Sequence, residues 1–460
     1  MPRWAPVLLL ISVGCQLDPS SVGEGSAANS VGETGVATTS GSDSAAATTT
    51  TTGGGATESL DDGGSTTASD DDTTTTGPPP PSGLLAHWGT FVASTEKGMQ
   101  MVEGVGFEPR AVLLWITEHT EDGVLDDGYF GRGWTDGVQS GAVATAWERD
   151  GNGASGRWVD TACITLVDEG GEVLAEGSGA GMLADGFSID WTIPGDGRRV
   201  TFLALGGDIE ARVGNRVLSD ATETIDSVGF SPDLVLLAGV QSLVSPGTNN
   251  RGGHGFGGAT AMGPVLGPMH SSAHREGTNG TGSSGLVEGA ALFTTDQDPS
   301  IDHAYAMSGV DFNGFGLSRQ QGTSTVGTTW LALRGIMADG GVILQPNATG
   351  PQAIDLDFEP VVVMFDGGDK VMEIGSEPEL VHGVAVGPDS QGALWMGRAG
   401  GATQSAWDLE QVLVSRTADA LLAAEASVTA MDASGFTLEW STVDGGARRI
   451  GWFALGSAAR

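Results

Sequence analysis

Histidine is unevenly distributed in this chain, in a way that could support metal chemistry. Four of the seven histidines lie between His254 and His303. Imidazole nitrogens bind zinc and other transition metals when three neutral side chains converge. The sequence therefore offers His270, His274 and His303 as candidate metal ligands. The competing interpretation is structural, because His254 recurs as His382 in a matching segment near the end of the chain, and turn or surface histidines need no metal.

The loop over residues 126–137, with the sequence DDGYFGRGWTDG, places aromatic rings among carboxylates. Aromatic faces stack on sugar rings and carboxylates accept hydrogen bonds from hydroxyl groups, a combination that suits carbohydrate sites. In the alternative interpretation both rings cover the core, and the near alignment of Tyr129 with Phe256 favours this for Tyr129. Trp134 has no aligned counterpart and is the stronger candidate. The candidate ligand-binding residues are Asp126, Asp127, Tyr129, Trp134 and Asp136.

The sequence carries none of the local motifs of common enzyme classes, and we expect a protein that is not an enzyme. A nucleophile elbow, a P-loop and a zinc-protease motif are absent, and no G-x-G-x-x-G match precedes a helical pattern, so neither nucleotide nor another cofactor is expected. A glycosidase site remains an open alternative, because it needs only two suitably spaced carboxylates and the chain has many acids. Asp296, Asp298 and Asp302 have the opening spacing of a calcium loop without its glycine and terminal glutamate, which favours an acidic turn. Calcium is the divalent cation that this composition would suit.

The chain is strongly acidic, and this excludes one class of partner. Its 460 residues include 58 Asp or Glu and 20 Lys or Arg, for a formal charge of −38. Such a surface repels phosphate backbones, so nucleic acid is not an expected partner. Glycine is abundant at 75 positions, but the strict triplet repeat of collagen is absent and 39% hydrophobic residues suffice for a core.

The first residues have the pattern of a bacterial signal peptide. Arg3 precedes the apolar run APVLLLISV, which is too short to span a membrane. The run ends at Ser12-Val-Gly-Cys15, which resembles the lipobox of bacterial lipoproteins. This resemblance implies a signal peptide over residues 1–14, lipidation of Cys15 and attachment to a membrane through the lipid. Gln16, where an aspartate would favour inner-membrane retention, implies an outer-membrane, surface-exposed location. The alternative is an ordinary secretory signal.

The next segment, residues 15–83, is expected to be a disordered tether. It consists largely of Ser, Thr, Gly, Ala, Asp and Pro, including the runs TTTTTT and PPPP. Such a segment buries too little apolar surface to offset the entropy lost on folding. If Cys15 carries lipid, Cys163 has no partner for a disulfide, because the chain has only two cysteines. Cys163 lies in the apolar run TACITLV and is expected to be a small core residue.

Three motifs recur in the same order along the rest of the chain. The first motif is VGFEPRAVLLW, VGFSPDLVLLAG and LDFEPVVVMFDGG, whose phenylalanines are Phe107, Phe230 and Phe358. The second is ADGFSIDW, FNGFGLSR and ASGFTLEW, and the third is FLAL, WLAL and WFAL. The period is about 125 residues, a normal size for one domain. We therefore expect repeats over residues 84–207, 208–335 and 336–460.

Each repeat has the composition of short strands. β-branched and aromatic runs such as RAVLLWITE and RRVTFLALGG alternate with Gly, Asp, Asn and Pro turns. Phe187, Ile189 and Trp191 alternate along DGFSIDW, which places them on one face of a strand. The run TADALLAAEAS has helical composition, but its register against the other repeats favours strand and turn. The expected fold is all-β, with three tandem β-sandwich (jelly-roll-like) repeats after the tether.

The G-F-x-P-x-x-V opening, the D-G-F-x-x-x-W strand and the closing aromatic-L-A-L-G together resemble a domain of uncharacterised phage virion and tail-fibre-like proteins and their bacterial relatives. The resemblance covers all three repeats and brings no catalytic residues with it. Fibre domains of this kind are commonly trimeric. The resemblance therefore implies that three tandem copies fold into one pseudo-threefold body rather than into separate beads.

These features together predict a surface-displayed bacterial lipoprotein that acts as a non-catalytic binding or adhesion module. A surface glycan or protein is the expected ligand, and carbohydrate binding fits the aromatic and acidic loop. A structural, self-assembling protein derived from a virion-like domain is the alternative. A glycan-active hydrolase is the third interpretation.

Overall fold

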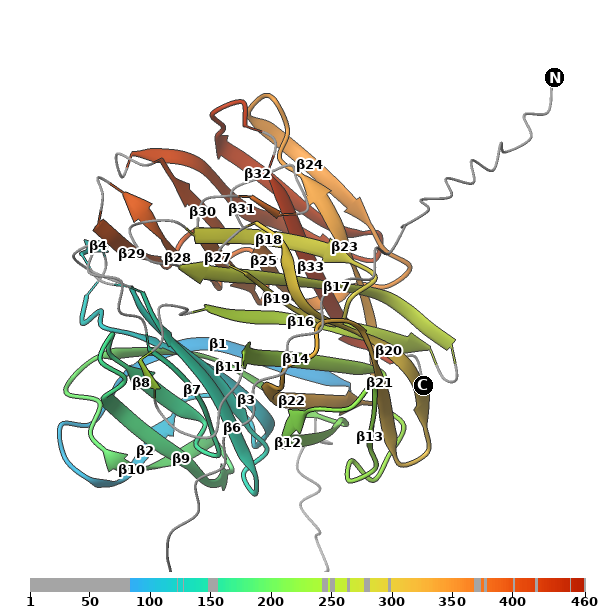
Figure 1. Cartoon of the computed structure of the whole chain (residues 1–460). Helices are drawn as coiled ribbons and strands as arrows, with labels where there is room; N and C mark the ends of the chain where they lie inside the picture. Colours follow the sequence, from blue (N-terminus) through green and yellow to red (C-terminus); the bar gives the residue numbers. More distant parts are fainter. Residues whose placement is uncertain are drawn as a thin grey trace, which may run out of the picture. The chain divides into compact units, whose positions relative to one another are not determined.

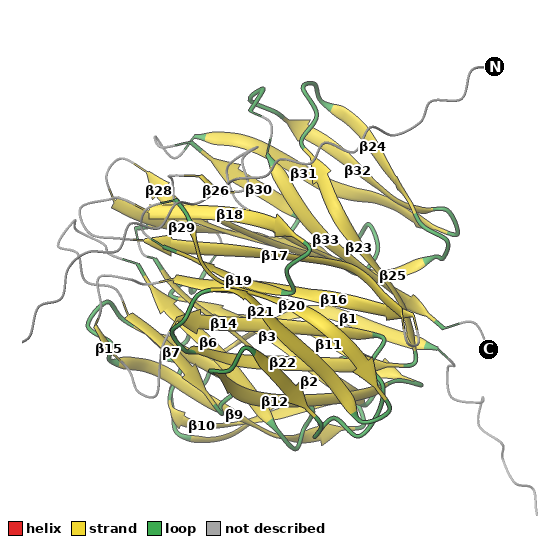
Figure 2. Ribbon diagram, turned by 45° about the vertical axis from the view of Figure 1, so that its right-hand side comes forward, coloured by secondary structure: helices red, strands yellow, loops and turns green. Residues whose placement is uncertain are grey.

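A computed structural model describes residues 83–121, 123–126, 128–147, 156–241, 247–248, 253–262, 265–276, 282–296, 299–367, 374–375, 379–399, 402–417, 421–446 and 448–458. Cys15, Asp127 and Asp298 lie outside these residues. Figure 2 shows that the described secondary structure consists of strands, without helices. In the part of the chain that is described, no helix is long and apolar enough to cross a membrane. The all-β prediction is confirmed, and the strands form six sheets in three sandwich-like pairs.

The first pair contains a seven-stranded and a four-stranded antiparallel sheet. The strands that its segment of the chain contributes to the two sheets are β1 (Leu84–Val92), β2 (Gly98–Glu103), β3 (Pro109–Thr117), β5 (Tyr129–Thr135), β6 (Ser140–Ala146), β7 (Gly156–Asp160), β8 (Ile164–Val167), β9 (Val173–Leu183), β10 (Gly186–Ile193) and β11 (Arg199–Gly207). The larger sheet begins in the order β1-β11-β3-β5-β6-β7, and the smaller one has the order β2-β10-β9-β8.

The second and third pairs repeat this strand order. The strands of the second segment are β12 (Glu210–Leu218), β13 (Thr222–Ile225), β14 (Leu234–Gln241), β16 (Gly253–Met262), β17 (Val265–Glu276), β18 (Gly282–Glu288), β19 (Leu292–Thr295), β20 (Ile301–Asp311), β21 (Gly314–Gln321) and β22 (Val326–Arg334). The strands of the third segment are β23 (Ile336–Leu344), β24 (Gly350–Asp355), β25 (Pro360–Gly367), β27 (Glu379–Ala385), β28 (Gln391–Ala399), β29 (Ala402–Asp408), β30 (Leu413–Arg416), β31 (Leu422–Asp432), β32 (Gly435–Thr442) and β33 (Arg449–Ser457).

Side-chain alternation explains why these segments form strands with one buried face. Phe187, Ile189 and Trp191 on β10 are buried, whereas Asp190 between them is exposed. The segment with helical composition near residue 420 enters β31, because its alternate alanines pack into the core of the third pair. Cys163 is buried, which confirms the expectation of a small core residue.

Three short strands are exchanged between the pairs in a cycle. These strands are β4 (Gly123–Leu125), β15 (Gly247–Thr248) and β26 (Ile374–Gly375). β4 leaves the first segment and pairs with β29 of the third, as Figure 1 shows where the two labels lie together. β15 of the second segment pairs with β7 of the first, and β26 of the third pairs with β18 of the second. Each large sheet therefore has its seventh strand from another segment, and the cycle closes within one chain.

A shared core joins the three large sheets. One continuous cluster contains Trp134 from the first segment, Leu236 and Phe256 from the second, and Met364 and Phe453 from the third. Each pair also has its own core between its two sheets. The described residues from 83 onward consequently form one compact unit rather than separate beads.

The shared core contains a buried ion pair between two segments. Arg132 Nη2 on β5 lies 2.7 Å from Asp366 Oδ2 on β25, and the two side chains are 1% and 5% exposed. The guanidinium carbon of Arg132 also lies 3.8 Å from the centroid of the Phe256 ring of the second segment. His382 Nδ1 lies 3.1 Å from the same carboxylate oxygen, Asp366 Oδ2. One charged group from the first segment thus contacts both other segments at the centre of the unit.

Removal of one partner of this pair should destabilise the whole compact unit. In Asp366→Asn the Arg132 charge stays buried without its counter-ion, and we expect the free energy of unfolding to fall by about 3–5 kcal/mol. Urea denaturation followed by tryptophan fluorescence measures this change. In the control double variant Arg132→Met with Asp366→Leu, most of the loss should be recovered, because no charge is left buried. A single variant within 0.5 kcal/mol of the parent on the same scale would contradict this role.

Candidate functional site

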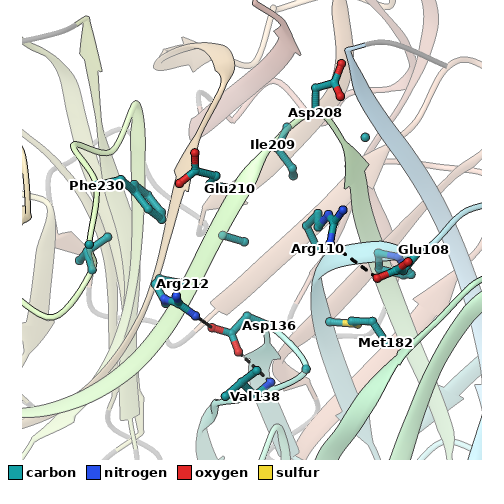
Figure 3. Close-up of a pocket in the computed structure, with 16 residues that line it drawn as sticks. Glu108, Arg110, Asp136, Val138, Met182, Asp208, Ile209, Glu210, Arg212 and Phe230 are labelled. Atoms are coloured by element: carbon teal, nitrogen blue, oxygen red, sulfur yellow. Dashed lines mark hydrogen bonds and ion pairs between the residues drawn. The ribbon is translucent and has the colours of Figure 1, made fainter. Parts of the chain in front are cut away.

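A groove lies where the first segment meets the second. Its volume is about 770 Å³, within the range of small-molecule sites. We call it the first junction groove. Its floor is the linker Gly207–Ile209 and the beginning of β12, and its walls come from the start of β3, the β5–β6 turn and the loop before β14 (Figure 3). Its charged lining residues are Glu108, Arg110, Asp136, Asp208, Glu210 and Arg212.

Two arginines present donors in the first junction groove. Arg110 and Arg212 have side chains 53% and 45% exposed. Arg110 Nη1 lies 3.6 Å from Glu108 Oε1, and Arg212 Nη1 lies 3.8 Å from Asp136 Oδ2, as the dashed lines in Figure 3 mark. Both distances exceed normal hydrogen-bond lengths. The guanidinium groups can therefore turn toward a ligand without breaking a strong internal bond.

Asp136 holds the wall of the groove in place. Its Oδ1 accepts the backbone N–H groups of Val138 and Gln139 at 2.9 and 2.7 Å, which fixes the β5–β6 turn. Its Oδ2 accepts the backbone N–H of Val213 at 3.1 Å, which ties β12 to that turn. Because three donors already occupy this carboxylate, its role is to position the wall of the groove.

The rim of the groove carries exposed apolar side chains. Val138 at the β5–β6 turn is 80% exposed, and Met182 of β9 lies beside it in the lining. Polar groups inside and apolar groups at the rim suit a ligand with both kinds of surface.

The structure corrects the expectation that Trp134 is exposed to a ligand, whereas Tyr129 covers the core, as the favoured alternative predicts. Trp134 is fully buried, and its Nε1–H donates to Thr329 Oγ1 of the second segment at 2.7 Å. Tyr129 is buried and its hydroxyl donates to Glu169. Burial and that carboxylate raise the pKa of Tyr129. Asp126 is exposed and accepts from Gln404 Nε2 at 2.7 Å, away from the groove. Asp127 lies outside the described residues, and of the four predicted ligand residues that are described, Asp136 lines the groove.

The predicted metal ligands His270, His274 and His303 do not converge. His270 stacks on Phe453 with ring centroids 4.0 Å apart. His303, on the small sheet of the second pair, contacts Ser324 Oγ at 2.8 Å. Among the described residues no group of three or more His, Cys, Asp or Glu could hold a metal ion. The expectation of a histidine metal site is therefore corrected.

A different set of histidines gathers around the buried ion pair. His274 Nε2 lies 3.6 Å from Asp366 Oδ1, and the rings of His254 and His274 are 5.8 Å apart. The Arg132 guanidinium already supplies the positive charge beside Asp366, which leaves no electrostatic need for a metal cation there. Arg132 lies inside the 126–137 loop and Asp366 inside the first repeated motif, but no spacing in the sequence links the two residues, so their pairing is visible only in the fold.

Burial and charge determine the protonation states of this cluster. Burial lowers the pKa of His382 to about 4 and that of His270 to about 3. Burial and the Arg132 charge together hold the pKa of His254 well below its ordinary value. Burial alone would raise the pKa of Asp366, but Arg132 and the neighbouring imidazoles hold it well below its usual range. At neutral pH the ion pair thus lies beside the neutral imidazoles of His254 and His382.

Comparison with protein-family models and with curated proteins finds no match for this chain.

Stability should fall as the pH drops from 7 toward 4. Unfolded histidines bind protons near pH 6.5, whereas folded His382 does so near pH 4. As the pH falls, protons therefore bind the unfolded chain before the folded one. The free energy of unfolding decreases between pH 6.5 and pH 4, by about 3 kcal/mol for His382 alone. Below about pH 4, protonation of Asp366 in the unfolded chain adds to the loss.

Urea midpoints at pH 7 and pH 5 measure this dependence. The variant His270→Phe keeps the stacking on Phe453 and removes one titrating group, so its midpoint should change less with pH. Equal midpoints for the parent chain at the two pH values would refute this account.

Proposed function

We propose that this chain is a surface-displayed bacterial lipoprotein that binds a hydroxyl-rich ligand, such as a glycan, in the first junction groove without chemical catalysis. The observation that carries the proposal is the pairing of half-exposed arginines with carboxylates in a groove of about 770 Å³. Carboxylates accept hydrogen bonds from hydroxyl groups, and guanidinium groups donate to hydroxyl and ring oxygens. Val138 and Met182 offer apolar contacts for the C–H faces of a sugar.

The net charge favours a neutral ligand over an acidic one. A formal charge of −38 repels polyanions at long range. The groove itself is also net negative, because four acids and two arginines line it. A neutral glycan satisfies both donors and acceptors and meets no such repulsion. A Cys15 lipid anchor and a long tether would hold the groove clear of the membrane surface.

The ligand role of the arginines can be tested on a glycan array and then by calorimetry with the best-bound glycan. Arg110→Ala and Arg212→Ala each remove a charged donor worth about 1.5–3 kcal/mol, so each should weaken binding by roughly tenfold or more. Lys97→Ala is the matched control, because it removes one exposed positive charge outside the groove. Glycan binding that survives both arginine substitutions unchanged would rule out this groove as the glycan site.

The proposed anchor is tested by fractionation of cells that express the full chain. Cys15→Ser removes the thiol that lipid would modify, so the protein should leave the membrane fraction and lose incorporation of a clickable fatty acid. Protease digestion of intact cells should remove the parent protein if it faces outward. A chain that stays in the membrane fraction and still incorporates fatty acid after Cys15→Ser would refute the anchor.

A further inference from the structure

A second groove lies where the second segment meets the third. Its volume is about 400 Å³. We call it the second junction groove. Its apolar lining includes Pro268, Ile336, Met337, Ala338 and Phe358. Its acidic lining residues are Asp233, Asp339 and Asp357, and no Arg, Lys or His is among its lining residues.

The two junction grooves occupy equivalent positions in the fold. Ala211 of β12 pairs with Leu333, and Ala338 of β23 pairs with Leu455, and both leucines close the third repeated motif. The residue after each alanine is a groove residue, Arg212 in the first and Asp339 in the second. Phe230 and Phe358 of the first repeated motif line the two grooves in turn.

The chemistry of the two grooves is inverted at these matched positions. Arg110 lies three residues after Phe107, and Asp233 lies three residues after Phe230. Each arginine of the first groove is therefore matched by an aspartate in the second. Asp233 Oδ2 accepts the N–H groups of Gly335 and Ile336 at 2.7 and 3.3 Å, which holds the start of β23 beside the groove. The sequence changes have altered the lining without altering the groove's place.

Other matched positions make the second groove more apolar. Register places Met337 where the first groove has Glu210. Asp357, next to Phe358, is exposed and takes the position of Gly229. Asp339 Oδ1 accepts the Gly340 N–H at 2.8 Å. The second groove thus combines acids with Met337, Pro268 and Phe358, and a ligand seated there would contact an apolar wall and carboxylates together.

We propose that the second junction groove binds an organic cation, an amine or guanidinium carried on an apolar body. The carboxylates of Asp339 and Asp357 would bind the charged group, because an ionised donor and acceptor form the strong class of hydrogen bond. The Phe358 face adds a cation–π contact. Met337 and Pro268 would pack against the apolar body. This site does not depend on glycan binding in the first groove.

The test uses three probes of one shape on the full chain. These are 2-phenylethylamine, neutral 2-phenylethanol and anionic phenylacetate, and binding is measured by calorimetry at physiological salt. The amine should bind at least tenfold more tightly than the alcohol, and the acid should not bind. Equal affinities for amine and alcohol would overturn the proposal without any variant being needed. Ethylamine bound as tightly as 2-phenylethylamine would also overturn it, because the apolar wall would then play no part.

Matched variants locate the amine. Asp339→Asn and Asp357→Asn should each weaken amine binding by about fivefold or more, and Met337→Ala should weaken it without changing the charge. Asp190→Asn is the control, because Asp190 is an exposed acid on the small sheet of the first pair. Arg212→Ala should leave amine binding intact, which separates this site from the first groove. Amine binding reduced equally by Asp190→Asn would show general attraction to an acidic surface and overturn the site.

Discussion

The buried ion pair between Arg132 and Asp366 is the contact on which the arrangement of the three segments depends. The two residues lie in different segments, and a residue of the remaining segment, Phe256, covers the guanidinium face. A buried pair of this kind adds little net stability, because desolvation offsets most of the attraction. Its stronger effect is on specificity, because an arrangement that separates the partners leaves two buried charges uncompensated. The pair therefore selects one order of the segments around the centre.

Matched positions show why only one order works. Trp115, Ala238 and Asp366 each lie eight residues after the phenylalanine of the first repeated motif. Their cross-strand partners are Arg132, Phe256 and His382. This register corrects the sequence alignment, because it matches His382 with Phe256 instead of His254, and Phe256 with Arg132 instead of Tyr129. Three different side chains thus occupy each matched position, with one cation and one anion in total. The cyclic exchange of β4, β15 and β26 follows the same order, so edge-strand pairing and core electrostatics support a single assembly.

Local patterns in the sequence were sufficient to predict the strands but not their partners. Alternation along β10 and β32 fixes which faces are buried, and the three motifs fix where each segment begins. The exchanged strands pair with residues far along the chain, such as Val124 with Ala406, and no local period encodes such pairing. The same limit explains Trp134. Its place in a loop rich in Gly and Asp suggested exposure, but the shared core buries it against Thr329. The groove positions of Arg110 and Arg212 could not be predicted, because residues from two segments form the groove and no contiguous motif marks it.

Triplication within one chain permits an asymmetry that three identical chains could not have. In a homotrimer every position recurs three times around the axis, so an arginine at the position of Arg132 would bury three like charges with no acid among them. A single chain can place arginine, phenylalanine and histidine at those positions and bury one compensated pair. The same freedom applies at the segment junctions, where matched lining positions hold arginine in one groove and aspartate in the other. The floor of each groove is the start of an edge strand, and backbone groups pair that strand with its neighbour. The side chains that line the grooves can therefore change while the sheets stay intact. The covalent linkage of the three segments thus has two consequences. It allows three different residues to meet at the centre, and it allows the two junction grooves to have different linings.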